Sequence, residues 1–200
     1  MMFDLFPYGS RIYGTSDEQS DTDLIMVVDQ GVDPEVQHQF SNVDLTVWTT
    51  AEYKRLLDAH EPSALECQFL PSGIGIRSHW FDFKLDLGKL RKAFSAKSSN
   101  SWVKAKKKIE VHGEFRLGLK SLFHSLRLLD FGIQIATLGR ISDYGSANEY
   151  WRDIQNQKWG LAGFRNFTSW CDYKEYWQPK YNKLRTDFRL VAPLPEGENE

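Results

Sequence analysis

The chain has 200 residues, of which 41% are hydrophobic and 14% aromatic, enough for one globular unit or two small lobes with a buried core. No stretch approaches the roughly 20 apolar residues of a membrane-spanning helix, and the first residues lack the pattern of a secretory signal. Two cysteines, Cys67 and Cys171, are too few for a disulfide framework. We therefore expect a cytoplasmic protein without disulfides or a membrane partner, with both cysteines acting as small buried hydrophobes.

The formal net charge of −2 conceals an uneven distribution along the chain. Residues 1–66 contain 13 acidic and 3 basic side chains, whereas residues 84–120 contain 11 basic and 3 acidic ones. This asymmetry is consistent with an acidic lobe that holds cations and a basic segment that faces an anionic ligand. Two solvated faces that neutralise each other would give the same counts, so the motifs must decide.

The first third of the chain has the pattern of short strands separated by turns. Residues 3–8 are mainly apolar and aromatic and end at Gly9-Ser10, which is typical of a strand that enters a tight turn. Residues 21–28 end in a continuous apolar run, as buried strands do. Residues 42–48 alternate well enough to form another strand. The pattern predicts a small mixed sheet with flanking helices.

Three aspartates on these strands have the chemistry of a metal site. Side chains alternate faces along a strand, so Asp21 and Asp23 project from one face about 7 Å apart, where they repel each other unless a cation or a proton lies between them. If the strand that carries Asp44 lies beside them, three carboxylates converge. Such hard oxygen ligands suit Mg²⁺ or Mn²⁺, and a pair of these ions can activate an attacking hydroxyl and stabilise a leaving pyrophosphate.

The Gly9-Ser10 turn suggests a phosphate-bearing substrate for these carboxylates. A glycine lets the backbone approach a phosphate closely, and exposed N–H groups and the serine hydroxyl can donate hydrogen bonds to its oxygens. Arg11 could add a positive charge there. We therefore expect an NTP to contact Gly9, Ser10 and Arg11.

The ordered combination of these motifs resembles the signature of the polymerase-beta-type nucleotidyltransferase superfamily. The resemblance covers roughly the first third of the chain and consists of the turn at residues 9–15, the Asp-x-Asp strand at 20–24 and the later carboxylate Asp44. It implies metal binding by the three aspartates and triphosphate contacts from the Gly-Ser turn. Each piece alone is common in surface loops, so the alternative is a set of turn and loop residues without this function.

The middle of the chain predicts two helices and a boundary between lobes. A helix opens at 50–52 with its N-cap at Thr49 or Thr50, and a second begins at Pro62 and ends near Pro71. Glu66 on this second helix is expected to face solvent rather than the metal centre. We place the nucleotidyltransferase lobe at residues 1–80, a helical lobe at 81–192 and a flexible tail at 193–200.

The helical lobe begins with a short helix over residues 87–94. We expect a serine-rich break at 95–101 to end this helix. The lysine-rich run at 104–108 follows. By default such a run is a solvated helix face, and contact with a nucleic acid is the alternative.

Residues 114–138 predict the strongest helix in the chain. Arg116, Lys120, His124 and Arg127 fall within roughly an 80° arc of this helix, away from its apolar stripe. A row of potentially cationic side chains is tolerated readily when it faces an anion, here a triphosphate. His124 could equally be a core histidine with satisfied hydrogen bonds.

This helix narrows the resemblance to the RNA-ligase-associated nucleotidyltransferase family of bacteria and phages. The family's Lys-x-x-x-His-x-x-Arg helix maps onto Lys120, His124 and Arg127, and the resemblance then extends to about residue 155. It implies that these three side chains bind the NTP and that the protein has a role in RNA repair.

Aromatic residues are frequent after residue 144. They could stack on single-stranded bases, but they are more typical of the core of a small helical cap. Residues 172–190 predict a final helix.

The sequence thus predicts an α/β (α+β) enzyme that binds Mg²⁺ or Mn²⁺ and transfers a nucleoside monophosphate from an NTP held between the lobes. An RNA or tRNA-like 3′ end is the favoured acceptor. A hydroxyl of a partner protein, as for nucleotidyltransferase antitoxins, and a small molecule such as an aminoglycoside are rivals within this class. The rivals outside it are a non-catalytic nucleotide- or RNA-binding module and a structural protein with coincidental motifs.

Overall fold

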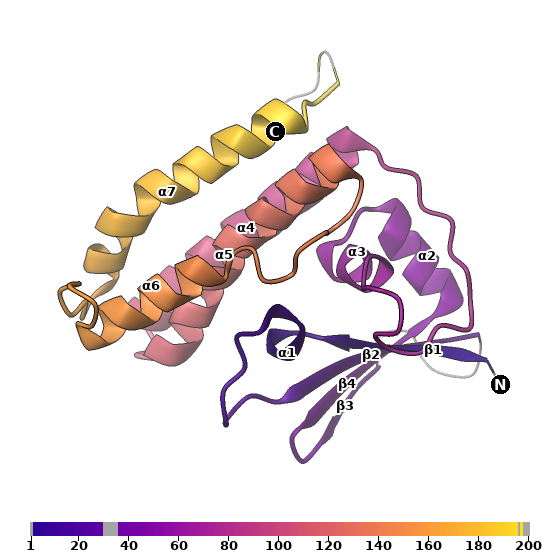
Figure 1. The fold of residues 1–200 in the computed structure, drawn as a ribbon, viewed down its shortest axis with the longest axis horizontal. Helices are drawn as coiled ribbons and strands as arrows, with labels where there is room; N and C mark the ends of the chain where they lie inside the picture. The colour runs from indigo at the N-terminus through magenta and orange to yellow at the C-terminus, as the bar shows by residue number, and fades with distance from the viewer. Residues whose placement is uncertain (1, 30–35, 196, 198–200) are drawn as a thin grey trace. The chain divides into compact units, whose positions relative to one another are not determined.

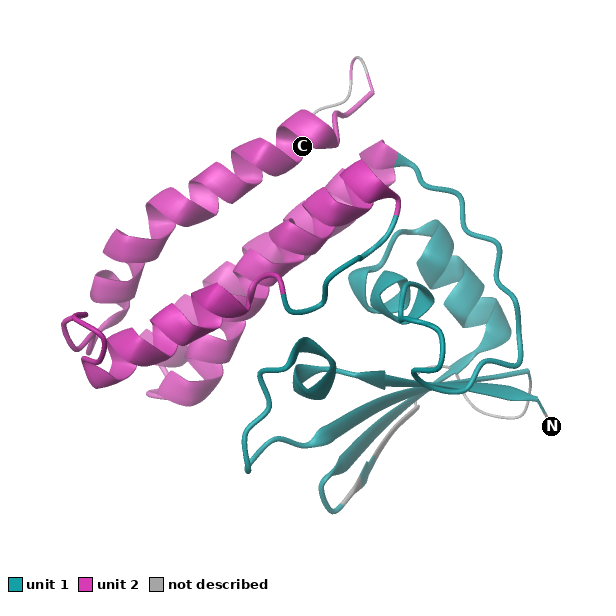
Figure 2. Cartoon of the chain, viewed as in Figure 1, with its two compact units in different colours: residues 1–86, 140–145 teal, residues 87–139, 146–200 magenta. Residues whose placement is uncertain are grey.

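The computed structural model describes residues 2–29, 36–195 and 197, which fold into two compact units (Figure 2). Unit 1 comprises residues 1–86 and 140–145, and unit 2 comprises the remainder. The first unit thus extends beyond residue 80, and a short later segment returns to it. Tyr144 in that segment is buried and donates a hydrogen bond to the carbonyl of Glu66 at 2.5 Å. Of the expected tail, residues 196 and 198–200 lie outside the described residues.

Unit 1 is built on a four-stranded mixed sheet (Figure 1). Its strands lie in the order β1-β2-β4-β3, with β2 and β4 parallel and both outer pairs antiparallel. The strands are β1 (Phe3–Tyr8), β2 (Thr22–Val28), β3 (Val36–Phe40) and β4 (Val43–Thr49). The mixed sheet and its three expected strands are confirmed, and β3 is an addition that the sequence pattern did not indicate.

Two helices cover one face of this sheet (Figure 1). Helix α2 (Thr50–Asp58) begins where β4 ends, and the Thr49 hydroxyl caps it by accepting a hydrogen bond from the Glu52 amide at 3.1 Å. Helix α3 (Pro62–Gln68) has its proline in the first turn, where the missing N–H costs nothing. Tyr53 of α2 is fully buried against the aromatic rings of Phe6 and Trp48. This aromatic cluster fixes the helices against the sheet.

In the part of unit 2 that the structure describes, every regular element is a helix. Its elements are α4 (Leu87–Glu110), α5 (Phe115–Leu138), α6 (Asn148–Trp159) and α7 (Trp170–Val191). Together with the sheet of unit 1 they confirm the α/β (α+β) class and the helical C-terminal part, and α5 coincides with the strongest predicted helix.

Helix α4 does not break at the serine-rich stretch, so that prediction is wrong. Ser98 is buried, and its hydroxyl donates a hydrogen bond to the carbonyl of Ser125 on α5 at 2.8 Å. Ser101 is buried as well. These buried serines are small, and the hydroxyl of Ser98 is hydrogen-bonded within the core. Helix α4 therefore runs unbroken against α5, and tertiary packing outweighs the modest helix propensity of serine.

The aromatic residues of the last 50 positions mostly form a core. Trp170, Tyr173, Trp177 and Tyr181 are all at least 97% buried along α7, and the Trp177 indole donates a hydrogen bond to Gln157 Oε1 at 2.7 Å. These residues follow the packing interpretation rather than base stacking.

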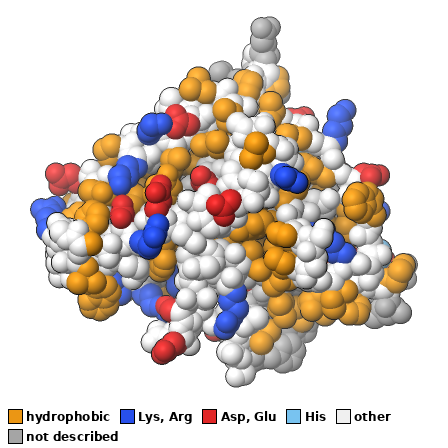
Figure 3. Space-filling view, viewed as in Figure 1, with side chains coloured by type: hydrophobic (Ala, Val, Ile, Leu, Met, Phe, Trp, Pro, Cys, Tyr) orange, Lys and Arg blue, Asp and Glu red, His pale blue; other side chains and the backbone are white. Residues whose placement is uncertain are grey.

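Both cysteines are free thiols. Cys67 is buried in α3 as expected, but Cys171 is exposed because it follows Trp170 on a helix whose buried face is set by Trp170, Tyr173 and Trp177. Among the described residues, no helix combines the length and apolar character that crossing a bilayer requires. Basic and acidic side chains are interspersed on the face seen in Figure 3.

Candidate active site

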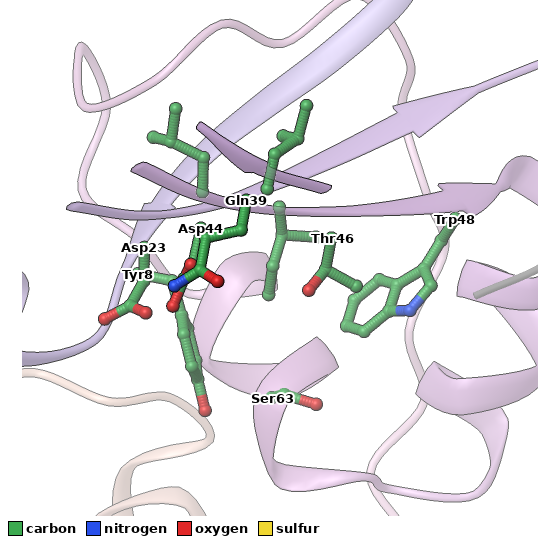
Figure 4. Close-up of a pocket in the computed structure, with 10 residues that line it drawn as sticks. Tyr8, Asp23, Gln39, Asp44, Thr46, Trp48 and Ser63 are labelled. Carbon is green, nitrogen blue, oxygen red and sulfur yellow. The ribbon is translucent and has the colours of Figure 1, made fainter. Parts of the chain in front are cut away.

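Four side chains form a row across the sheet of unit 1, one from each strand. The strand register pairs Tyr8 with Asp23, Asp23 with Asp44 and Asp44 with Gln39. Residues directly opposite each other on neighbouring strands point to the same face, which brings the two carboxylates together between a phenol and an amide (Figure 4). Neighbouring strands lie about 4.8 Å apart, so Asp23 and Asp44 are close enough to share one ligand.

This row forms one end of a pocket of about 800 Å³ that lies wholly within unit 1. The sheet face supplies most of its lining, and Ser63 of α3 contributes from the covering helix (Figure 4). Asp23 and Asp44 are half-buried, so water or a ligand can reach them. A volume of this size suits a nucleotide-sized ligand.

Gly9 lies directly against Asp23. It ends the turn after β1 with φ 75° and ψ −155°, a conformation that is essentially reserved for glycine, and it caps the short helix α1 (Ser10–Tyr13). A Cβ atom at this position would lie only 1.9 Å from Oδ2 of Asp23. The glycine is thus required twice, by its backbone conformation and by the carboxylate beside it. The Gly-Ser turn predicted to bind a triphosphate and a carboxylate predicted to bind metal are neighbours in space.

Arg11 on α1 and Asp21 at the end of the loop before β2 lie outside this carboxylate pair. Arg11 is exposed, and its guanidinium donates a hydrogen bond to the carbonyl of Ser20 at 3.2 Å. It therefore supports the loop, whatever contact it makes with a ligand. Asp21 is exposed, precedes the first residue of β2, and is not among the residues that line the pocket. Of the three predicted metal ligands, the structure brings together Asp23 and Asp44.

A hydrogen bond to a buried carboxyl group holds helix α1 in place. Glu66 is 1% exposed and accepts a short hydrogen bond from the hydroxyl of Tyr13, the last residue of α1. The prediction that Glu66 faces solvent is therefore wrong: it lies in the core, where a residue far along the chain donates a hydrogen bond to one of its carboxyl oxygens. This link holds the helix that follows Gly9-Ser10.

A second buried carboxylate, which sequence reasoning missed, crosslinks the edge of the sheet. Asp4 on β1 is fully buried and accepts hydrogen bonds from the amides of Ser78 and His79 and from Nδ1 of His79 at 2.5–3.0 Å. The Nε2 atom of His79 lies 2.9 Å from Oδ1 of Asp29. The hydrogen bond to Asp4 raises the pKa of His79, with Asp29 adding to the effect against a smaller opposing effect of burial. An aspartate inside an apolar strand was the available signal for this clamp.

The remaining predicted site residues lie on helix α5 of unit 2. Arg127 is buried, with its guanidinium over the rings of Phe123 and Phe131 at 5.7 and 5.5 Å. It lies 2.8 Å from Nδ1 of His124, and because arginine can only donate, that nitrogen is the acceptor of a neutral ring. Lys120 is half-buried one turn earlier. That these three contact a triphosphate stays a prediction.

His124 differs in charge from the other side chains of the row on α5. Burial lowers its pKa well below the usual value, and the charges of Arg127, Lys97 and Lys104 lower it further. The ring is therefore an uncharged member of the row at neutral pH. Lys97 and Lys104 belong to α4, so the two helices contribute cations to the same place.

Part of the lysine-rich run engages in ion pairs within unit 2. Lys106 lies 3.8 Å from Glu110, and Lys108 lies 2.6 Å from Glu114. These contacts are those of a solvated helix face, and they are worth little individually. Contact between this run and RNA stays a prediction.

The donor set fits a divalent cation only in part. Within the part of the chain that the structure describes, no three or more histidine, cysteine, aspartate or glutamate side chains are grouped to hold a metal ion. Asp23 and Asp44 nevertheless offer two half-buried carboxylates on adjacent strands. Mg²⁺ is commonly held by one or two carboxylates and completed by substrate phosphates and water, which is the chemistry that these residues can support.

The chain was also compared with known proteins. No protein-family model matches it, and no curated protein matches it either. The function of this chain is therefore inferred from its motifs and from the geometry of unit 1.

Proposed function

We propose that this protein is a metal-dependent nucleotidyltransferase that transfers a nucleoside monophosphate from an NTP to an acceptor hydroxyl, with RNA as the favoured acceptor. The observation that carries the proposal is the Gly9-Asp23-Asp44 arrangement. A glycine turn built for close backbone approach adjoins one carboxylate, and the second carboxylate is its direct neighbour in the sheet. Nucleotidyl transfer needs these two functions, phosphate binding and metal binding, side by side.

Each residue of the site has its own role in binding or transfer. The backbone at Gly9 and the hydroxyl and amide of Ser10 bind the β- and γ-phosphates, since glycine lets the backbone approach a phosphate closely and these groups can donate hydrogen bonds to its oxygens. Asp23 and Asp44 would hold Mg²⁺ or Mn²⁺, which when bound stabilises the negative charge of the phosphates. Asp21 at the edge of the strand would assist as a ligand of the same metal site.

In the transfer itself, the acceptor oxygen forms a bond to the α-phosphorus while the bond between that phosphorus and the bridging oxygen to the β-phosphate breaks. Pyrophosphate leaves with the electrons of the broken bond. Asp44 lies on the side of the row away from the Gly-Ser turn and accepts the proton of the attacking hydroxyl, as a general base. The products are an acceptor–NMP adduct and pyrophosphate.

Incubation of the protein with each α-³²P-labelled NTP, Mg²⁺ or Mn²⁺ and a mixed tRNA pool tests this proposal. We expect label in RNA with the parent protein, and a loss on the order of 100-fold or more for Asp23→Asn and Asp44→Asn, because metal-held charge stabilisation is worth several kcal/mol. Asp82→Asn, at an exposed aspartate of the same unit, is the matched control and should retain activity.

The same experiment separates the acceptor classes. Label on protein alone would assign the acceptor to a polypeptide, and an RNA acceptor should show an affinity that falls steeply with salt as phosphate contacts release counterions. Metal-dependent NTP binding without transfer to RNA, protein or small hydroxylated molecules would contradict the enzyme and favour a binding module.

A further inference from the structure

The pocket continues well beyond the two carboxylates. Asp44, Thr46 and Trp48 occupy alternate positions of β4 and all line the same pocket, and the first and last are separated by about 13 Å along the strand. Ser63 on α3 lies below them, across the pocket from the sheet (Figure 4). At the far end, Thr46 contributes a hydroxyl from the sheet and Ser63 contributes one from α3. The indole of Trp48 lies farther along β4.

Trp48 forms a fixed wall at that far end. Its side chain is 5% exposed and stacks on Tyr53, with ring centroids 6.0 Å apart and planes at 24°. Its indole N–H is buried and makes no hydrogen bond with any residue that the structure describes. Buried donors normally have an acceptor, and among the described residues that line the pocket Trp48 is one whose buried donor has none.

The charge of the pocket restricts what its far end can bind. None of the described residues that line it is a lysine or an arginine, and its charged side chains are the carboxylates of Asp23 and Asp44. A triphosphate would lack positive partners along β4. The far end therefore suits an uncharged group that combines hydroxyls with a flat ring, because such a group can hydrogen-bond to Thr46 and Ser63 and pack against an aromatic wall.

We propose that the part of the pocket formed by Thr46, Trp48 and Ser63, here called the Trp48 subsite, binds a nucleoside unit of the acceptor. This inference rests on the proposed nucleotidyl transfer and specifies its acceptor. A ribose hydroxyl lies at Asp44, the sugar extends past the two side-chain hydroxyls, and the base packs against the indole. The nucleoside unit can be a free nucleoside or the 3′-terminal residue of an RNA, which share this chemistry.

Binding at the subsite can be measured without any catalytic turnover. In protein labelled with ¹⁵N-tryptophan, the Trp48 indole resonance is assigned by its loss in Trp48→Phe. The four ribonucleosides, a short RNA with a free 3′ hydroxyl, and the same RNA with a 3′ phosphate are titrated in turn. We expect the Trp48 resonance to shift with a nucleoside or with the RNA that has a free 3′ hydroxyl, and to respond far less to the 3′ phosphate, whose charge faces the carboxylates. The tighter of the two ligands identifies the source of the acceptor.

Matched variants test which side chains hold the ligand. Thr46→Val and Ser63→Ala should each weaken binding about fivefold, as the loss of one hydrogen bond does, with unchanged circular dichroism. Ser72→Ala alters an exposed serine of the same unit outside this pocket and should leave binding unchanged. An unmoved Trp48 resonance with every nucleoside and RNA, or a shift that both variants leave intact, overturns the subsite.

The proposed subsite and the proposed transferase activity can be disproved independently of each other. Label transferred to an acceptor while Trp48 stays silent would retain the transferase and remove the subsite. A saturable Trp48 shift without any transfer would retain the subsite as a nucleoside-binding site and remove the transferase.

Discussion

The Cα atom of Gly9 is so close to the Asp23 carboxylate that the smallest side chain at residue 9 would put its Cβ 1.9 Å from Oδ2. Real carbon and oxygen atoms do not approach that closely, so any substitution must displace the carboxylate, the turn, or both. Because Asp23 pairs in register with Asp44, a displaced Asp23 also disturbs the carboxylate pair. The identity of residue 9 therefore controls the geometry of the whole candidate site.

We predict that Gly9→Ala abolishes metal-dependent nucleotide binding and transfer while the protein remains folded. The φ of 75° adds a backbone cost of about 1–3 kcal/mol for a residue with a side chain. The measurements are NTP affinity by calorimetry and the free energy of unfolding by urea titration.

Gly73→Ala is the control that separates strain from contact. Gly73 has a φ of 87°, but a Cβ there would meet nothing within 4 Å. It should lower stability without lowering NTP affinity. Equal losses of affinity in both variants would mean that the clash with Asp23 is irrelevant.

The hydrogen bond between Tyr13 and the buried Glu66 should stabilise α1 through a strong coupling. Tyr13→Phe removes one donor from a buried carboxylate, so we expect a loss of about 1–3 kcal/mol in the free energy of unfolding. A double-mutant cycle with Glu66→Gln should give an interaction energy of about 0.5–3 kcal/mol, measured by urea unfolding. Additive effects of the two substitutions would contradict a direct bond in solution.

Local pattern was sufficient to predict much of the fold. Helix α5 has a continuous apolar stripe and was found within one residue, and β2 and β4 have the apolar or alternating runs of buried strands. Helix α4 was predicted to break because serines favour turns, whereas the hydroxyl of Ser98 bonds across to α5. Such a partner, 27 residues away, has no trace in the local sequence.

The candidate site was predictable in composition but not in geometry. The motif identified Asp23 and Asp44, yet their adjacency depends on the parallel register of β2 and β4, which no local pattern specifies. Glu66 and Asp4 were missed for a related reason. Each is buried beside a side chain from a distant segment, Tyr13 or His79, that hydrogen-bonds to its carboxyl group.

The clamp of His79 between Asp4 and Asp29 predicts a pH dependence of stability. The raised pKa means that the folded protein binds this proton more tightly than the unfolded chain does. The stabilisation is therefore complete below the unfolded pKa of about 6.5 and is lost as the pH rises through the higher folded pKa. Urea unfolding across pH 5.5–9 should show this loss in the parent protein and its absence in His79→Asn.

His112 supplies the control for that experiment, since it is an exposed histidine between two helices. His112→Asn should keep the pH profile of the parent. A profile that is flat in the parent, or one that His112→Asn removes, would place the titrating group elsewhere.

His124 should show the opposite pH dependence. Its pKa is lowered by burial and then by the charges of Arg127, Lys97 and Lys104, so the unfolded chain binds this proton more tightly. Its contribution to stability is present above about pH 6.5 and is lost as the pH falls from there through the lower folded pKa. NMR titration of the His124 ring should give a midpoint below 6.5, with the spectrum of the neutral Nε2–H tautomer because Arg127 donates to Nδ1. Lys97→Gln should raise this midpoint by removing one charge, whereas Lys92→Gln on the same helix should leave it in place. A midpoint at or above 6.5 in the parent protein would contradict the lowered pKa. A midpoint above 7 would mean that the ring is mostly charged at neutral pH, and the row on α5 would then have a fourth cation available for an anionic ligand.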